Sequence, residues 1–208
     1  MSEYKISWTT KQWESQQLLK LLGAYEADTD WSIVFDAKTW FTTKFDWNKM
    51  CDPKPRVGKC VLGTAWRDAH HNLEKHYDIV INEMLSPAGV PFTFHTQTVK
   101  DMIDQHGSVT KFCDWFQHKI PNCGITEFTC YNAYLIYKYG SCDVLYNTKE
   151  IYPGMTTFCT NLATGADVDM ASMLSLVSLT KSIHTRQYAN LQDKVIDLWK
   201  HYWTRQNI

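Results

Sequence analysis

The segment WSIVFDAKTWF, residues 31–41, places residues able to do chemistry at the end of a short apolar run. Asp36 follows the run directly, and Lys38 stands two positions later, where a second acid would complete a metal site. A carboxylate is a suitable ligand for a hard cation such as Mg²⁺ or Mn²⁺, whereas a lysine is not. Asp36 is therefore a candidate metal ligand or binding residue. The alternative is that it caps a turn.

A second candidate is His95, which follows the apolar stretch FTF. Imidazole titrates near neutral pH, so His95 can bind a substrate or act as a general base. The alternative is a hydrogen-bonded structural histidine. His70, His71 and His76 lie close in sequence, but His71 and His76 are five positions apart rather than the four of a helical metal pair. We expect these three to form a solvated face.

The composition is that of a globular and nearly neutral chain. Its 208 residues are 44% hydrophobic and 21% charged, which favours a single folded domain spanning residues 1–208. Lys and Arg total 21 against 22 Asp and Glu. A wholly basic surface for nucleic acid is therefore not expected, although a local patch remains an alternative.

The cysteines and the amino-terminal segment bear on the cellular compartment. Seven cysteines, none of them in a C-x-x-C pair, argue against a disulfide scaffold or a zinc ribbon and favour free thiols. The segment MSEYKISWTTKQW is polar, and no run of eighteen apolar residues occurs in the chain. We expect a cytoplasmic protein that does not contact a membrane.

Apolar spacing predicts helices that alternate with short strands. The predicted helices cover residues 11–26, 65–85, 98–106, 109–118, 126–139 and 188–203. The predicted strands cover residues 32–35, 59–64, 92–96, 143–147, 156–162 and 175–184. This alternation indicates an α/β fold with a layered, mostly parallel sheet flanked by helices. Ligands of such sheets bind beyond the carboxyl ends of the strands, where Asp36, His95 and His184 are expected.

Three stretches, in this order, carry a resemblance to a known family. WESQQLLKLLGAYEADTDWSIVFDAKTWF resembles the pattern W/Y-x-x-Q-Q-L-x-K-L…D-Y-x-x-x-x-D-A-D-T-x-F. GVPFTFHTQTVKDMI resembles a hydrophobic strand followed by His and a helix, and GITEFTCYNAYLIYKYG resembles F-S-E-Y-x-x-Y-G-x-Y-L. Together they cover residues 13–140. They are similar to the motifs of a family of GT-A-fold glycosyltransferases that use nucleotide sugars.

The resemblance implies that Asp36 and Lys38 lie on the donor side of a transferase site. In GT-A enzymes an aspartate pair holds a divalent cation against the donor diphosphate, and here Lys38 replaces the second acid. The resemblance thus makes Mn²⁺ or Mg²⁺ the candidate cofactor, with Asp36 as its ligand, and it also allows Lys38 to neutralise the diphosphate directly. It further implies that Gln17 and Lys20 line the cleft.

On the acceptor side, the resemblance implies that Glu127 or His95 deprotonates the attacking hydroxyl. Glu127 follows Thr126, which is predicted to cap the helix that begins there, so Glu127 can also simply complement the helix dipole. The resemblance assigns His184 and Arg186 to the metal or the diphosphate. We therefore expect Asp36, His95 and Glu127 to converge on one open crevice.

Besides the replacement of the second acid by Lys38, the chain departs from the family in the segment before the first motif. Members carry a strand–helix unit there that holds the nucleotide base, and only about a dozen residues precede Trp13 here. We expect the fold to lack part of this unit, which leaves two alternatives: an oligomeric enzyme completed by a second chain, or a catalytically inactive binding or partner protein. If the protein is viral, a hydroxylated DNA base is a further acceptor to consider, although the neutral net charge does not favour it.

Overall fold

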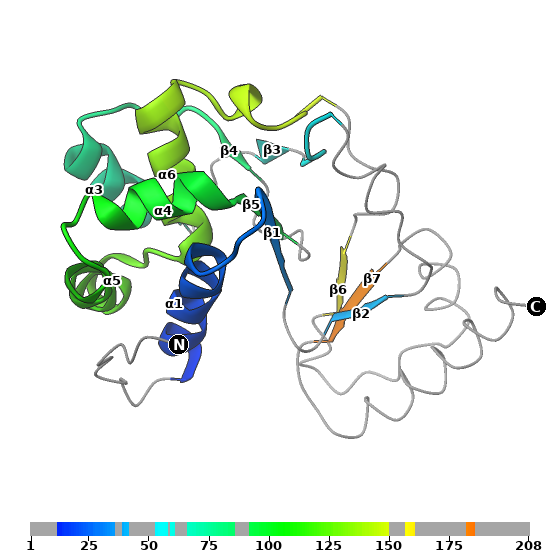
Figure 1. The fold of residues 1–208 in the computed structure, drawn as a ribbon, viewed down its shortest axis with the longest axis horizontal. Helices are drawn as coiled ribbons and strands as arrows, with labels where there is room; N and C mark the ends of the chain where they lie inside the picture. Colours follow the sequence, from blue (N-terminus) through cyan, green and yellow to red (C-terminus); the bar gives the residue numbers. More distant parts are fainter. Residues whose placement is uncertain are drawn as a thin grey trace, which may run out of the picture.

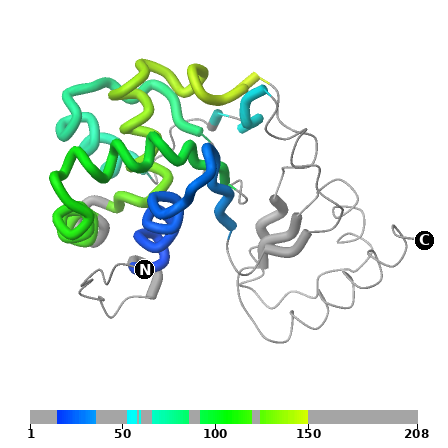
Figure 2. Tube along the Cα trace, viewed as in Figure 1, coloured from blue at the N-terminus to red at the C-terminus, as the bar shows by residue number. Residues whose placement is uncertain are grey.

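The structure is a computed structural model, and its described parts are coloured or labelled in Figures 1 and 2. It describes residues 12–35, 39–41, 53–57, 59–60, 66–85, 92–149, 157–160 and 182–185. Side-chain surroundings are described within residues 15–35, 53–57, 59, 66–85, 92–119 and 124–149.

The described residues form a mixed α/β fold (Figure 1). Its helices are α1 (Gln12–Tyr25), α3 (Arg67–Tyr77), α4 (Thr96–Asp104), α5 (Val109–Cys123), α6 (Glu127–Tyr139) and the short 3-10 helix η2 (Cys142–Val144). Its strands are β1 (Trp31–Val34), β2 (Thr39–Phe41), β3 (Lys59–Cys60), β4 (Met84–Leu85), β5 (Phe92–His95), β6 (Thr157–Thr160) and β7 (Ser182–Thr185).

Several predicted elements need correction. The helix predicted over residues 65–85 ends at Tyr77, because Asp78 adopts a left-handed conformation with φ of 53° and its N–H bonds back to the helix. The segment 143–147 is not a strand but overlaps η2. The helix predicted over residues 109–118 is longer, because α5 continues to Cys123. The predicted terminal helix, 188–203, lies outside the described residues.

The pairing of the strands also differs from the expectation. β1 pairs with β5, β2 with β7, and β3 with β4, all antiparallel, and only β6 with β7 is a parallel pair among the described strands. The expected mostly parallel sheet is therefore wrong for this part of the chain. A short apolar run looks the same in either kind of pairing, so the sequence pattern could not decide between them.

The hydrophobic core lies where α1, α4, α5 and α6 meet (Figure 1). Figure 2 shows residues 15–35 lying beside residues 92–149 despite their distance in sequence. The large side chains that are almost completely buried there include Leu18, Leu21, Phe92, Phe94, Phe112, Phe116 and Tyr131. Three cysteines of the described part, Cys113, Cys130 and Cys142, are buried free thiols. No described helix has both the length and the hydropathy to span a membrane.

Helix α6 is the central element of this core. Its start is defined by a capping box in which the Thr129 N–H donates to the Thr126 hydroxyl at 3.2 Å and the Thr126 N–H donates to Oγ1 of Thr129 at 2.8 Å. Its end is defined by Gly140, with φ of 77°. The predicted cap at Thr126 is confirmed. Because α6 is buried on nearly all sides, its polar side chains need partners inside the protein.

Two tyrosine hydroxyls supply the hydrogen bonds that a further strand would give to β5. The His95 N–H donates to the Tyr131 hydroxyl at 2.9 Å, and the Tyr146 hydroxyl donates to the Thr93 carbonyl at 2.7 Å. The two hydroxyls lie 2.7 Å apart, so Tyr131 donates to Tyr146. Thr93 and His95 are two residues apart and present their backbone groups on one edge of β5. Thr96 continues the ladder toward β1.

The side chain of Asn132 likewise makes hydrogen bonds to the backbone at β4. Its Nδ2 donates to the Glu83 carbonyl at 2.9 Å, and its Oδ1 accepts from the Leu85 N–H at 2.9 Å. The Glu83 carboxylate in turn accepts from the Cys142 N–H at 2.7 Å and pairs with Lys59 of β3. Side chains of α6 thus complete the edges of strands that are too short to build a wide sheet.

The hydrogen-bonded hydroxyls of Tyr131 and Tyr146 predict that loss of a buried hydroxyl destabilises the protein more than loss of an exposed one. Tyr146→Phe leaves the buried Thr93 carbonyl and the Tyr131 hydroxyl without their partner, and we expect a loss of about 1–3 kcal/mol in the free energy of unfolding. Urea denaturation followed by circular dichroism measures this loss.

Tyr137→Phe is the matched control, because Tyr137 lies on the same helix but its side chain is 52% exposed. The control should change stability by less than about 0.5 kcal/mol. Equal effects of the two substitutions would contradict the role given to the tyrosine chain.

Candidate functional site

Three residues of the predicted site, from α1 and α6, meet in one buried cluster. The Lys20 Nζ lies 2.8 Å from Oε1 of Glu127. The Gln17 amide, oriented so that its nitrogen faces Glu127, donates to Oε1 at 3.0 Å and also to Oε2. The two partners of the ion pair are 107 positions apart in the sequence. That Gln17 and Lys20 line a cleft stays a prediction.

The local sequence explains this arrangement. Gln17 and Lys20 are three residues apart on α1, so their side chains project from the same face of the helix. Glu127 is the first residue of α6, where its negative charge also complements the helix dipole. The Lys20 ammonium lies 5.1 Å from the centroid of the Phe128 ring, a cation–π contact that adds to the ion pair.

Burial decides what the cluster can do chemically. The Glu127 side chain is 0% exposed and that of Lys20 is 11% exposed. A buried carboxylate that accepts from a lysine and an amide is well suited to hold α1 against α6. An acceptor hydroxyl cannot reach this carboxylate unless α1 moves, so the described conformation does not present Glu127 as a base.

His95 lies in a different environment. It is half-buried between β5 and α4, where its Nδ1 shares a hydrogen bond with the Thr98 hydroxyl at 2.8 Å. Its ring meets Trp31 edge to face, with centroids 4.9 Å apart. Desolvation lowers the pKa of His95, and the charge of Lys138 lowers it further. The imidazole is thus neutral at pH 7, the form that can accept a proton.

The His95 backbone contacts Tyr131, one turn after Glu127, whereas the His95 ring lies toward the end of α6. The Thr98 hydroxyl that bonds His95 also lies 3.2 Å from the hydroxyl of Tyr139, the last residue of α6, whereas Glu127 is the first. Twelve residues of helix separate Glu127 from Tyr139, which corresponds to about 18 Å. Because the Glu127 side chain is 0% exposed and His95 is half-buried, the described residues do not show both candidate bases on one open crevice.

The antiparallel pairing of β1 with β5 separates His95 from the end of β1. Trp31 pairs with His95, whereas Val34, after which the chain leads to Asp36, pairs with Phe92. The expectation that His95 would share an edge with the end of β1 is wrong, because it assumed parallel strands. In an antiparallel pair the carboxyl end of one strand meets the amino end of the other.

The remaining predicted site residues are tested less directly. Asp36, Lys38 and Arg186 lie outside the described residues. His184 belongs to β7, where it pairs with Thr39, and its side chain lies outside the described part. Within the described residues, no group of three or more His, Cys, Asp or Glu side chains could hold a metal ion.

Other neighbours of His95 were missed at the level of sequence. Thr98 lies one helical turn after His95, and this short spacing is a signal that could have been used. The ion pair between Lys138 and Asp101 joins α6 to α4 beside His95. No pattern in the local sequence predicts this pair. The predicted solvated face also needs correction, because His70 is buried, with 6% exposed, against the core side of α3.

Comparison with known proteins places the chain in a family without assigning a reaction. A family model described as a family of unknown function (DUF6492) matches residues 1–161. No curated protein and no solved structure matches the chain.

The buried ion pair leads to a prediction about stability. Glu127→Gln keeps the shape of the side chain but removes the negative charge that faces Lys20, so we expect a loss of about 3 kcal/mol in the free energy of unfolding. Urea denaturation measures this. Asp101→Asn is the matched control, since the Lys138–Asp101 pair is about one-third exposed on each side, and it should cost less than about 1 kcal/mol. A Glu127→Gln protein as stable as the unaltered chain would show that this pair does not hold α1 against α6.

The lowered pKa of His95 predicts a dependence of stability on pH. Below its ordinary pKa of 6.5 the unfolded chain binds a proton that the folded ring resists, so the free energy of unfolding falls as the pH drops from about 7 to about 5. His70, His76 and His106 have pKa values lowered in the same direction, mainly by desolvation. Urea midpoints across this range measure the slope. His95→Asn should reduce the slope, and an unchanged slope would contradict the assignment to His95.

Proposed function

We propose that this chain, which belongs to a family of unknown function (DUF6492), is a GT-A-like glycosyltransferase that moves a sugar from a nucleoside diphosphate to a hydroxyl acceptor. In the proposed reaction the acceptor oxygen forms a bond to the anomeric carbon. The bond from that carbon to the diphosphate breaks, the diphosphate leaves with the electron pair, and a base takes the proton of the hydroxyl.

The observation that supports this proposal is the cluster of Gln17, Lys20 and Glu127. These residues belong to the first and third stretches of the family resemblance, and they meet in a buried ion pair. The second stretch forms β5 and α4, which pack against β1 and α6. The three stretches therefore belong to one structural unit, as expected of motifs that serve a common site.

His95 is the base that we favour. It is half-buried rather than sealed, and its lowered pKa keeps the ring neutral at pH 7. In the proposal Asp36 and Lys38 hold the donor diphosphate, with Mn²⁺ or Mg²⁺ on Asp36 or with Lys38 in place of the cation. His184 and Arg186 are proposed to approach the same diphosphate. Glu127 then serves as a positioning residue that fixes α6 to α1.

A second candidate function has its own support. Glu127, which the resemblance makes a candidate base, is 0% exposed and paired with Lys20. A protein in which the carboxylate expected to be the base is instead a structural anchor fits a catalytically inactive binding protein. Such a protein would bind a sugar nucleotide or a partner without turning over a donor.

Isothermal titration calorimetry with uridine and guanosine diphosphate sugars tests the proposal. We expect at least one donor to bind, and Lys38→Ala to weaken this binding about tenfold through loss of a charge on the diphosphate. Transfer to a hydroxyl acceptor should then be lost by a factor of about 10²–10⁴ in His95→Asn while donor binding is kept. If Lys38 replaces the cation, turnover should persist in EDTA.

Lys75→Ala is the control for charge, because Lys75 is an exposed lysine of α3 and should leave donor binding unchanged. Absence of heat with every donor would remove the transferase assignment. Donor binding without turnover in the unaltered chain would favour the inactive binding protein instead. A strict need for manganese would contradict the role of Lys38 as a substitute for the cation.

A further inference from the structure

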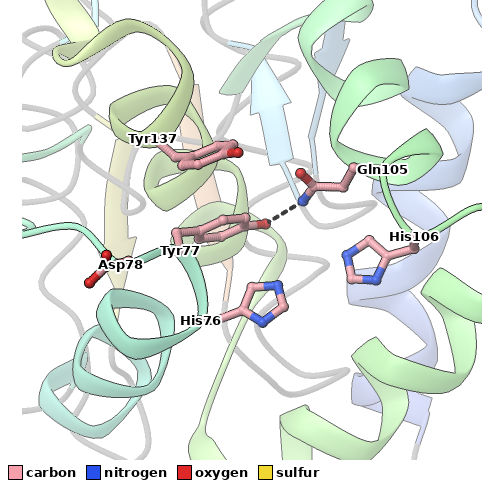
Figure 3. Close-up of a pocket in the computed structure, with 6 residues that line it drawn as sticks. All are labelled: His76, Tyr77, Asp78, Gln105, His106 and Tyr137. Atoms are coloured by element: carbon pink, nitrogen blue, oxygen red, sulfur yellow. Dashed lines mark hydrogen bonds between the residues drawn. The ribbon is translucent and has the colours of Figure 1, made fainter.

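A pocket of about 350 Å³ opens on the face of the helical core formed by the end of α3, the α4–α5 connection and α6. This volume lies at the lower end of the range of about 300–1,000 Å³ that is typical of small-molecule sites. Figure 3 shows the residues that line it, which are His76, Tyr77, Asp78, Gln105, His106 and Tyr137. None of them belongs to the site proposed above.

Aromatic rings form one wall of the pocket. Tyr77 and Tyr137 stack with centroids 5.1 Å apart, and Figure 3 shows Tyr137 lying over Tyr77. Tyr77 is held in place, because it is buried and its hydroxyl accepts from Nε2 of Gln105 at 3.2 Å. Tyr137 remains 52% exposed. The wall therefore offers a fixed, partly exposed aromatic surface on which a flat, apolar face of a ligand can rest.

Polar groups stand around this wall. Asp78 and Gln105 are both exposed, and Figure 3 shows the Asp78 carboxylate on one side of the Tyr77 ring and the Gln105 amide on the other. The His106 ring points toward His76 and Tyr77 in Figure 3, and its Nε2 is buried with no hydrogen-bond partner among the described residues. A buried nitrogen is costly to leave without a hydrogen bond. The His106 ring is packed by His76, Phe112 and Trp115, so it shapes the floor of the pocket.

The charge of the lining selects among ligands. Desolvation lowers the pKa of both His76 and His106, with Lys119 contributing at His76 and His76 contributing at His106. Both rings are thus neutral at pH 7, and Asp78 is the charged group of the lining. A site of this charge disfavours phosphates and nucleotides, which seek arginine, lysine or a helix N-terminus.

We propose that this pocket is a binding site for an uncharged saccharide, with a face of a sugar ring on Tyr137 and hydroxyls of the saccharide on Gln105 and Asp78, which border the aromatic wall on its two sides. A sugar ring has an apolar C–H face and a rim of hydroxyls that both donate and accept. The pocket presents a complementary arrangement: one aromatic surface with an amide on one side and a carboxylate on the other. The inference goes beyond the proposed transferase activity and does not rest on it.

Two other ligand classes fit less well. A metal ion would need more ligands than the pair of imidazoles, whose rings stack at 5.9 Å between centroids, and no metal-binding group is found among the described residues. A methylated ammonium ion is recognised by aromatic rings that face one another across a gap. Here Tyr77 and Tyr137 stack on each other, so they present one surface rather than a cage.

Saturation-transfer difference NMR on the full chain, with the methyl glycosides of galactose, mannose and N-acetylglucosamine as probes, tests this proposal. We expect millimolar binding of at least one glycoside. Tyr137→Ala should weaken it about tenfold by removing the aromatic surface, whereas Tyr137→Phe should retain it. Asp78→Gly should weaken binding by a similar factor. Glycine accepts the left-handed backbone of this position, so the helix end is preserved.

Val144→Ala is the matched control, because Val144 is 45% exposed on η2 and outside the pocket. It should leave binding unchanged. The proposal is overturned if none of the glycosides binds, or if Tyr137→Ala and Val144→Ala bind a glycoside equally well. Uridine diphosphate is included as a charged probe. The proposal is also overturned if uridine diphosphate binds and Tyr137→Ala abolishes that binding. Because the readout is binding of a free glycoside, failure here is distinct from failure of donor binding at Lys38.

Discussion

The fold depends on hydrogen bonds that buried side chains of α6 make to the backbone of short strands. β4 has two residues and β5 has four, so neither can satisfy its edge within a wide sheet. The hydroxyls of Tyr131 and Tyr146 satisfy the backbone groups on one edge of β5. The side chain of Asn132 satisfies backbone groups at β4. An unsatisfied buried N–H or carbonyl is costly, and this cost ties the position of α6 to that of both strands. The result is a buried helix that is rich in tyrosine and carries the buried Asn132.

The fixed position of α6 also determines where the Glu127 cluster and the His95 site lie. The start of α6 carries Glu127 to Lys20 and so links α6 to α1. Farther along, Tyr131 holds the backbone of His95, and the end of the helix brings Tyr139 and Lys138 near the His95 ring. One helix therefore positions an anchoring acid at its first residue and the neighbourhood of a neutral imidazole toward its last. The saccharide pocket uses Tyr137 of the same helix, on an exposed side.

Much of the helical structure could be predicted from the sequence, because local signals determine it. The threonine cap of α6 and the glycine after it mark that helix, and apolar spacing marks α1 and α4. The end of α3 was missed because Asp78, rather than a glycine, takes the left-handed conformation. The direction of strand pairing and the burial of Glu127 depend on contacts between distant segments. Residue type and short-range spacing do not contain that information.

The chain of hydroxyls behind β5 also has a consequence for the order of folding. The Tyr146 side chain reaches back 53 positions to Thr93, and Glu127 reaches back 107 positions to Lys20. During synthesis the amino-terminal helix and both paired strands emerge well before the groups that complete them. Such long loops close slowly, so the first half of the chain should remain loosely organised until residue 146 has left the ribosome.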